Sequence, residues 1–504
     1  MTALDKIRIL QLGYEDWTGR FSLPETISLL YEEVLEQAPE KPFDLVFLDR
    51  APLPEEIMPL YQASKAYTLF VAEQVELEGE ADWLYRSRKG RRIAVSDLSD
   101  FLLHEARNYF PKPYGEKFNP GSLAISRDFK GSVRWNGNYS VCLNGDFGEK
   151  LCQAAFWRNN IPVFSGQCID LWLEYRKDPG VRIALTVTQF VQGSVADVQQ
   201  KWEFSEEDLD QVVRIDNQMR DGVAFVSLSA AGCGELQIIA LHDRYSRRGH
   251  GHFLPGGERY VTSEREEVFC YFDPGDLKPP LNVYFSGYKT LEGFESYRMM
   301  RKLGCPFLLL TESRLEGGCF YMGSEEYEEM IRSAIFRYMK ELGFTSDQVI
   351  LSGLSMGTFG ALYYGCDIRS HALILGKPLV NIGTVAANER LLRPGGFPTS
   401  LDVLRYLCGN TDTQSVQRLD ARFWDRFDAA DWGKSRFVVS YMIEDDYDAS
   451  AYQMLISHLH SEGVQVYGKG IHGRHNDDTG TIVSWFVSQY KKILFEDFSR
   501  KAEK

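Results

Sequence analysis

The stretch Gln-Val-Ile-Leu-Ser-Gly-Leu-Ser-Met-Gly-Thr-Phe-Gly-Ala-Leu-Tyr-Tyr-Gly, residues 348–365, decides the fold of the C-terminal half of this chain. Its first third is an apolar run that predicts a buried strand, and its last third begins a helix rich in small residues. Between them, residues 353–357 form the pattern G-x-S-x-G. A serine between glycines on a sharp strand-to-helix turn is typical of a nucleophile elbow, in which Cβ atoms at the flanking positions would collide with neighbouring backbone. We therefore predict that Ser355 is a nucleophile.

Two further chemical groups follow the elbow in the order that an α/β-hydrolase requires. A predicted strand at 436–442 ends in an acidic run, and a predicted strand at 464–467 is followed by a loop with two histidines. A serine hydroxyl needs a base to take its proton, and the base needs a carboxylate to hold its tautomer. We predict Asp445 as the acid and His475 as the base. The alternatives left open are Glu444 and Asp446 for the acid and His472 for the base.

An acyl-transfer site also needs two backbone N–H groups that stabilise the developing oxyanion. The position after the nucleophile supplies the first, which is the N–H of Met356. The loop after the early strand at 281–285 supplies the second, from Gly287 or Tyr288, and of these we favour Gly287. Residues 278–504 are thus predicted to form an α/β-hydrolase catalytic domain.

The first 125 residues predict a Rossmann-like α/β domain. Apolar runs at 7–13, 43–48 and 67–71 predict strands, and patterns at 27–35 and 52–66 predict helices between them. Such alternation is typical of a parallel sheet. After Gly13 the chain lacks the G-x-G-x-x-G fingerprint that lets backbone approach a pyrophosphate, so we predict no nucleotide cofactor.

Residues 126–277 show alternating runs and few helix signals, which predicts a β-sandwich of jelly-roll type that resembles carbohydrate-binding modules. Three tryptophans either stack on sugar rings or pack in its core: Trp135, Trp157 and Trp172. His242, His250 and His252 lie close together, but no cysteine or carboxylate motif completes a zinc set. We predict a polar hairpin loop there and no metal.

Composition narrows the possible partners. The net charge of −15 argues against nucleic acid, which requires a basic face. The densest basic run, residues 86–92, predicts a solvated turn, with contact to anionic membrane lipid or a partner as the alternative. Nine scattered cysteines without paired spacing predict free thiols in a reducing cytoplasm. No apolar run is long enough to span a membrane.

Four segments together resemble a known family: residues 7–12, the Gly-Leu-Ser-Met-Gly elbow, Tyr-Met-Ile-Glu-Asp-Asp-Tyr at 441–447 and Gly-Arg-His-Asn-Asp-Asp at 473–478. They resemble the accessory secretory proteins of the bacterial accessory Sec system, and among these the member with a serine-hydrolase-like triad. The resemblance implies a cytoplasmic protein that works with other accessory secretory proteins and the accessory Sec motor ATPase, with peripheral contact at the inner face of the cell membrane as a further option. It also implies support for export of serine-rich-repeat glycoprotein adhesins.

The same resemblance implies O-acetylation of N-acetylglucosamine on the adhesin. Ser355 would carry the acetyl group, His475 would act as base and acid, and Asp445 would orient His475. Two other classes of function remain open: a carbohydrate esterase that uses the same acyl-enzyme, and a non-catalytic scaffold of the export complex. Sequence does not identify the acetyl donor or separate a sugar acceptor from water.

Overall fold

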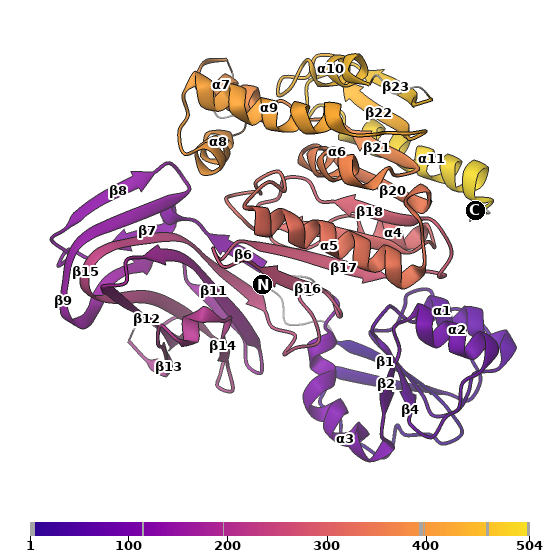
Figure 1. Cartoon of the computed structure of the whole chain (residues 1–504). Helices are drawn as coiled ribbons and strands as arrows, with labels where there is room; N and C mark the ends of the chain where they lie inside the picture. Colours follow the sequence, from indigo (N-terminus) through magenta and orange to yellow (C-terminus); the bar gives the residue numbers. More distant parts are fainter. Residues whose placement is uncertain are drawn as a thin grey trace.

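Three β-sheets follow one another along the chain. The computed structural model describes residues 6–500 apart from 113–114, 195, 393–396, 398 and 460–462. Figure 1 shows a small N-terminal unit, a curved antiparallel sheet beside it and a larger C-terminal unit whose sheet carries helices on both faces. The expected mixed α/β class with parallel sheets is confirmed. All nine cysteines are free thiols, as predicted.

The N-terminal sheet is entirely parallel, with the order β2-β1-β3-β4-β5. Its strands are β1 (Ile7–Leu12), β2 (Ile27–Glu32), β3 (Leu45–Leu48), β4 (Leu69–Ala72) and β5 (Arg91–Ile93). Helices α1 (Ile57–Ala63) and α2 (Gly79–Ser87) cover one face, and α3 (Leu98–Asp100) with the irregular turns up to Tyr109 covers the other. The helix predicted at 27–35 is wrong, because this segment pairs residue by residue with β1 as an edge strand.

The central sheet contains ten antiparallel strands. They are β6 (Gly115–Phe118), β7 (Leu123–Ile125), β8 (Ser132–Asn136), β9 (Ser140–Trp157), β10 (Ile161–Val163), β11 (Cys168–Lys177), β12 (Val181–Val191), β13 (Val198–Phe204), β14 (Val213–Asp216) and β15 (Gly222–Tyr245). The strands expected in this region are present, and all ten are hydrogen-bonded into one sheet. Strands β9 and β15 are long enough to run through both halves, so the sheet is continuous and curls around one apolar core.

The C-terminal sheet has the order β16-β17-β19-β18-β20-β21-β22-β23. Its strands are β16 (Glu258–Val261), β17 (Glu267–Asp273), β18 (Leu281–Phe285), β19 (Phe307–Glu312), β20 (Val349–Leu354), β21 (Ala372–Gly376), β22 (Arg436–Met442) and β23 (Gln465–Ile471). Strand β17 pairs antiparallel to both of its neighbours, and the pairs from β19 to β23 are parallel. The carboxyl ends of the parallel strands therefore share one edge of the sheet.

Helices pack on both faces of this sheet, and each face has its own apolar core. The helices are α4 (Tyr297–Lys302), α5 (Glu325–Leu342), α6 (Met356–Ile368), α7 (Ile382–Leu391), α8 (Ser400–Cys408), α9 (Thr413–Ala429), α10 (Ala451–His458) and α11 (Thr479–Phe498). Figure 1 shows α4 and α11 on one side, whereas α7 and α8 extend toward the tip of the central sheet. Within the described ranges, no helix has the length and apolar character that a membrane crossing needs.

The sheets end at different residues from the predicted domain limits at 125 and 277. Strands β6 and β7 precede the first limit but pair within the central sheet. Strands β16 and β17 precede the second limit but pair within the C-terminal sheet. Both errors have one cause: the sequence shows that these segments are strands, but only their hydrogen-bonded neighbours assign them to a sheet.

The basic run at 86–92 is not a solvated turn. Arg88 is buried, its guanidinium stacks 3.3 Å from the centroid of the Tyr61 ring, and it donates to the Tyr61 carbonyl at 2.9 Å. Lys89 pairs with Glu341 on α5, so it joins the N-terminal and C-terminal units. Arg92 donates to main-chain carbonyls within its own unit. Arg88 therefore belongs to the packed interior, whereas Arg86 and Arg92 stay exposed at the surface.

Candidate active site

Ser355 occupies a strained turn between the end of β20 and the start of α6. Its backbone has φ 53° and ψ −122°, a conformation that a residue with a Cβ adopts only when its surroundings impose it. The flanking glycines show why the turn needs them. A Cβ on Gly353 would lie 2.2 Å from the carbonyl carbon of Gly357, and a Cβ on Gly357 would lie 2.0 Å from the carbonyl oxygen of Phe285. The elbow geometry predicted from the sequence is present.

The structure brings the three predicted side chains into one hydrogen-bonded chain. Ser355 Oγ lies 2.8 Å from His475 Nε2, and His475 Nδ1 lies 2.8 Å from Asp445 Oδ2. His475 is only 1 % exposed and Asp445 8 %, so both are shielded from water. A carboxylate only accepts, so Nδ1 carries the proton and Nε2 can accept from the serine hydroxyl. This is the tautomer that a general base needs.

Each carboxylate of the acidic run has a different partner in the histidine loop. These partners show which carboxylate contacts which histidine, a point that the sequence left open. Asp445 contacts the ring of His475, and Asp446 accepts from the N–H of His475 at 3.0 Å. Glu444 lies 3.0 Å from the ring of His472, which is far from buried at 86 % side-chain exposure. The structure therefore places Asp445 and His475, not their neighbours, next to Ser355.

One predicted oxyanion donor is not available. The N–H of Gly287 donates to the Glu295 carboxylate at 2.7 Å, so it cannot also serve a substrate. The next N–H along the chain belongs to Tyr288, and none of the described residues accepts a hydrogen bond from it or from the N–H of Met356. Sequence reasoning missed this because the loop contains no signal for a carboxylate eight residues later that binds its backbone. Met356 and Tyr288 are therefore the candidate donors.

Two further groups position the site and were not singled out from the sequence. The Asp448 carboxylate accepts from the N–H groups of Val380 and Asn381 at 2.9 Å and 2.8 Å, which ties the acid loop to the segment after β21. Lys377 in that segment is buried and donates to the Thr479 hydroxyl at 3.2 Å. Burial lowers the pKa of Lys377, although Asp445 opposes the shift.

Aromatic side chains form a wall beside the histidine. Tyr447 packs edge-on against the His475 ring, with 4.4 Å between centroids. Phe397 contacts both Tyr447 and Tyr288, at 6.0 Å and 5.6 Å. The three rings come from three separate loops, so the wall exists only in the folded protein. Through Tyr447, this aromatic wall covers one side of the His475 ring.

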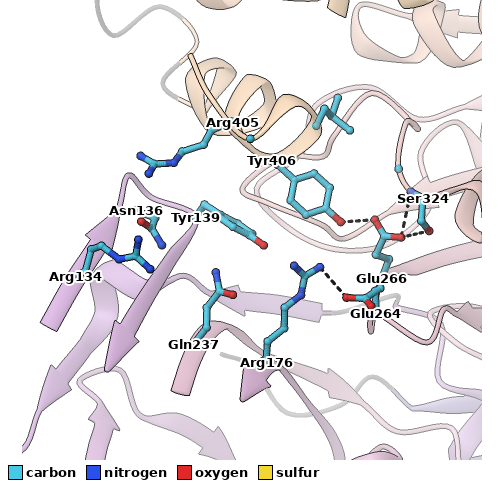
Figure 2. A pocket seen from close by; sticks show the side chains of 13 residues that line it. Arg134, Asn136, Tyr139, Arg176, Gln237, Glu264, Glu266, Ser324, Arg405 and Tyr406 are labelled. Atoms are coloured by element: carbon cyan, nitrogen blue, oxygen red, sulfur yellow. Dashed lines mark hydrogen bonds and ion pairs between the residues drawn. The ribbon is translucent and has the colours of Figure 1, made fainter. Parts of the chain in front are cut away.

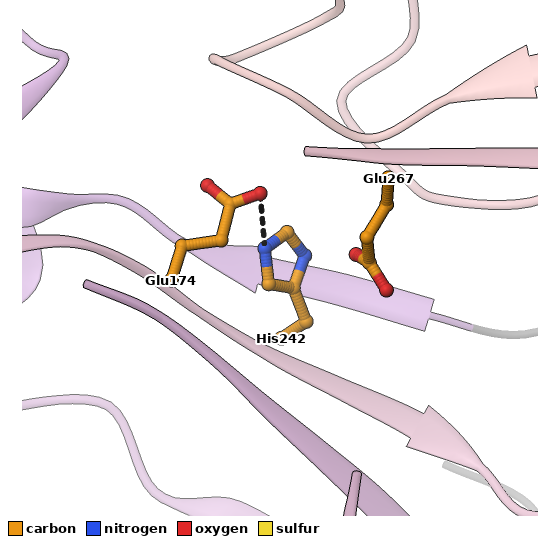
Figure 3. A group of neighbouring side chains, drawn as sticks. All are labelled: Glu174, His242 and Glu267. Carbon is orange, nitrogen blue, oxygen red and sulfur yellow. Dashed lines mark ion pairs between the residues drawn. The ribbon is translucent and has the colours of Figure 1, made fainter. Parts of the chain in front are cut away.

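A second cluster of polar side chains, Glu174, His242 and Glu267, has atoms close enough to hold a metal ion (Figure 3). Arg244 donates to both Glu267 oxygens, at 2.8 Å and 2.7 Å. Although burial opposes it, Arg244 and Arg259 hold the pKa of Glu267 well below its usual range. Guanidinium groups at these oxygens would repel a divalent cation, so we interpret the cluster as an ion-pair network that joins β11 and β15 to β17.

The three tryptophans that the sequence left between sugar stacking and core packing differ in their exposure to solvent. Trp157 and Trp172 are 0 % and 2 % exposed and belong to the packed interior. Trp135 on β8 is 48 % exposed and is free to contact a partner. His242, which precedes the predicted polar loop at 244–252, is fully buried in β15, whereas His250 and His252 follow that strand.

Comparisons with known proteins match almost the whole length of the chain. A family model described as "Accessory Sec system GspB-transporter" matches residues 7–500. An accessory Sec system protein of Streptococcus gordonii is 37 % identical over 99 % of this chain and 99 % of its own, and one of Staphylococcus aureus is 39 % identical over 98 % of each. A solved Glycosylation Associate Protein (Gap123) complex from Streptococcus agalactiae contains a chain that is 36 % identical. It covers 99 % of this chain and 100 % of that one, with a TM-score of 0.87. The chain therefore belongs to the accessory Sec system GspB-transporter family.

Proposed function

We propose that this accessory Sec system component is a serine-dependent O-acetyltransferase that modifies N-acetylglucosamine on serine-rich-repeat glycoprotein adhesins and supports their export. The observation that carries the proposal is the uninterrupted relay from Ser355 Oγ through His475 to Asp445, with both contacts at 2.8 Å. An α/β-hydrolase fold for the C-terminal unit is part of the proposal. It is supported by the nucleophile elbow, by the chain order serine, acid, histidine, and by the position of each group after a parallel strand.

The first half-reaction would acylate Ser355. His475 Nε2 takes the hydroxyl proton while Oγ attacks the carbonyl carbon of an acetyl ester or thioester donor. The negative charge on the carbonyl oxygen meets the N–H groups of Met356 and Tyr288. The tetrahedral intermediate then collapses, the bond to the leaving group breaks, and the leaving group receives the proton from His475. Asp445 stabilises the imidazolium that exists between these two proton transfers.

The second half-reaction would move the acetyl group to the sugar. A sugar hydroxyl gives its proton to His475 Nε2 and attacks the acetyl carbonyl carbon, which forms a second tetrahedral intermediate. As this collapses, the bond between the acetyl carbon and Ser355 Oγ breaks, and His475 returns the proton to Oγ. Water could follow the same course, so transfer depends on excluding it from the acyl-enzyme. The aromatic wall of Tyr288, Phe397 and Tyr447 supports transfer because it shields one side of His475.

The proposal includes partners. We place the protein in the cytoplasm with other accessory secretory proteins, the accessory Sec motor ATPase and the glycoprotein substrate. The related chain from Streptococcus agalactiae was solved as part of a complex, which supports assembly with such partners.

The deciding experiment replaces Ser355 with alanine and measures both the acetyl content of the adhesin glycans and the amount of adhesin exported. His472→Ala is the matched control, since His472 lies in the same loop as His475 but pairs with Glu444. Loss of acetyl groups in Ser355→Ala alone, with export retained, supports the transferase. Unchanged acetyl content would overturn it, and a rise would identify an esterase. Lost export with unchanged acetyl content would favour a scaffold.

A further inference from the structure

A polar pocket of about 380 Å³ lies where the central sheet meets the C-terminal unit (Figure 2). Strand β8 and the turn after it form one wall, and α8 with the start of α5 forms the opposite wall. The volume falls within the range of about 300–1,000 Å³ that is typical of small-molecule sites. Ser355, Asp445 and His475 do not line it. A ligand there would therefore bind apart from the proposed acyl transfer.

Most of the charge around this pocket is already neutralised. The Glu266 carboxylate accepts from Arg314 at 3.0 Å and from the hydroxyl of Ser324, the residue that caps α5. Glu266 therefore already occupies the position at the N-terminus of α5 where an anion would otherwise be attracted. Glu266 also accepts from the Tyr406 hydroxyl. Arg176 pairs with Glu264 at 3.2 Å, as Figure 2 shows.

Arg134, which also lines the pocket, pairs with Glu235 at 3.4 Å. The groups that remain are two amide oxygens, one phenol hydroxyl that can donate or accept, and one guanidinium. Gln237 and Asn136 both donate through their NH₂ groups to the Ser140 hydroxyl, at 2.7 Å and 3.0 Å, which leaves both amide oxygens available to the pocket. The Tyr139 hydroxyl and the Arg405 guanidinium have no hydrogen-bond partner among the described residues. The ring of Tyr139 stands nearly perpendicular to that of Tyr406, 5.4 Å away.

We propose that this pocket binds an uncharged saccharide. A sugar hydroxyl both donates and accepts, so successive hydroxyls can satisfy three oxygen acceptors and one guanidinium while the ring lies against an aromatic face. A phosphate or sulfate has few or no protons to donate and would leave the amide oxygens of Asn136 and Gln237 facing negative charge. The remaining set of hydrogen-bonding groups therefore matches a polyhydroxylated neutral ligand better than an anion.

The pocket is connected to the candidate active site through one short segment. Helix α8 carries Arg405 and Tyr406, and Phe397 lies three residues before that helix in the aromatic wall near His475. A glycan held in the pocket would contact the same segment that borders the acyl site. The saccharide site could then retain a glycosylated chain while Ser355 modifies another sugar of it.

Calorimetric titration of the full chain with N,N′-diacetylchitobiose, maltose and sodium sulfate tests the proposal. The double variant Tyr139→Phe/Gln237→Leu removes two oxygen acceptors with little change of volume. Tyr14→Phe is the matched control, because Tyr14 is 78 % exposed in the N-terminal unit. We expect one of the saccharides to bind, the double variant to weaken it at least about tenfold, and both Tyr14→Phe and Ser355→Ala to bind like the unaltered protein.

Three results would overturn the saccharide site. The first is that sulfate alone binds and that Arg405→Ala abolishes its binding. The second is that saccharide binding disappears in Ser355→Ala but persists in the double variant. The third is that neither sugar binds. Because Ser355→Ala is expected to keep the affinity, the result also separates this proposal from the acetyltransferase. Loss of acetyl transfer in Ser355→Ala does not depend on the pocket, and binding in the pocket does not depend on Ser355.

Discussion

Replacing Asp445 with asparagine tests the relay, because the contacts of the two carboxylate oxygens determine how the asparagine amide would be oriented. Asp445 Oδ1 accepts from the N–H groups of Tyr447 and Asp448, at 2.8 Å and 3.2 Å, and Oδ2 accepts from His475. The single oxygen of asparagine would keep the two backbone bonds, so its NH₂ would face His475. A donor there favours the tautomer with the proton on Nε2, which cannot accept from Ser355.

The expected loss is large because the serine then has no base. Disrupting the acid of such a triad lowers kcat by about 10³–10⁴-fold. At about 1.36 kcal/mol per factor of ten, this is about 4–5.5 kcal/mol of transition-state stabilisation. The assay is release of p-nitrophenol from p-nitrophenyl acetate, with thermal unfolding measured in parallel to establish that each variant is folded.

The neighbouring acids supply matched controls. Asp446 accepts from the backbone N–H of His475, and an asparagine oxygen can accept in its place. Glu444 binds the exposed loop around His472. We expect Asp446→Asn and Glu444→Gln to keep activity within about tenfold of the unaltered protein. The reasoning is refuted if either control loses as much activity as Asp445→Asn, or if Asp445→Asn retains activity.

Three other substitutions test packing and electrostatics. Gly357→Ala puts a Cβ 2.0 Å from the Phe285 carbonyl oxygen, so we expect at least about 3 kcal/mol of destabilisation in chemical denaturation, whereas unchanged stability would contradict the tight elbow. Arg88→Ala removes buried contacts to Tyr61 and should cost about 2–4 kcal/mol, measured in the same way, with the exposed Arg86→Ala near neutral. Burial raises the pKa of Asp243 from 3.8 to about 8, so the folded state holds this proton more tightly than the unfolded state. Stability is therefore lost as pH rises from about 4 through about 8. Asp243→Asn should show a shallower fall of Tm over that window, and parallel curves would contradict the shift.

Sequence was sufficient where local pattern determines structure. The elbow at 353–357 needs its glycines for steric reasons that operate within a few residues. Helix α5 is capped by Ser324 and ends at Gly343 in the left-handed conformation, which are residue types typical of those positions. Both features depend on residues that are neighbours in the chain. The approximate position of the acid and the histidine followed because each comes directly after a parallel strand.

Sequence failed where distant partners determine the outcome. Residues 27–32 have apolar spacing that also suits a helix, and pairing with β1 makes them a strand. For the acid, sequence favoured Asp445 but left Glu444 and Asp446 open, because the choice depends on how the histidine loop folds over them. The engagement of the Gly287 N–H by Glu295 depends on a loop that returns to the end of β18. None of these contacts has a signature in the local residue pattern.

The most direct measurement of the central claim is mass spectrometry of the protein after rapid mixing with an acetyl ester and acid quenching. The account predicts the mass of one added acetyl group, located by peptide mapping on Ser355, and its absence in Ser355→Ala. Asp445→Asn should accumulate the acetyl group far more slowly. An acetyl group found on another residue, or none on the unaltered protein under conditions in which it turns over the ester, would contradict the acyl-enzyme mechanism.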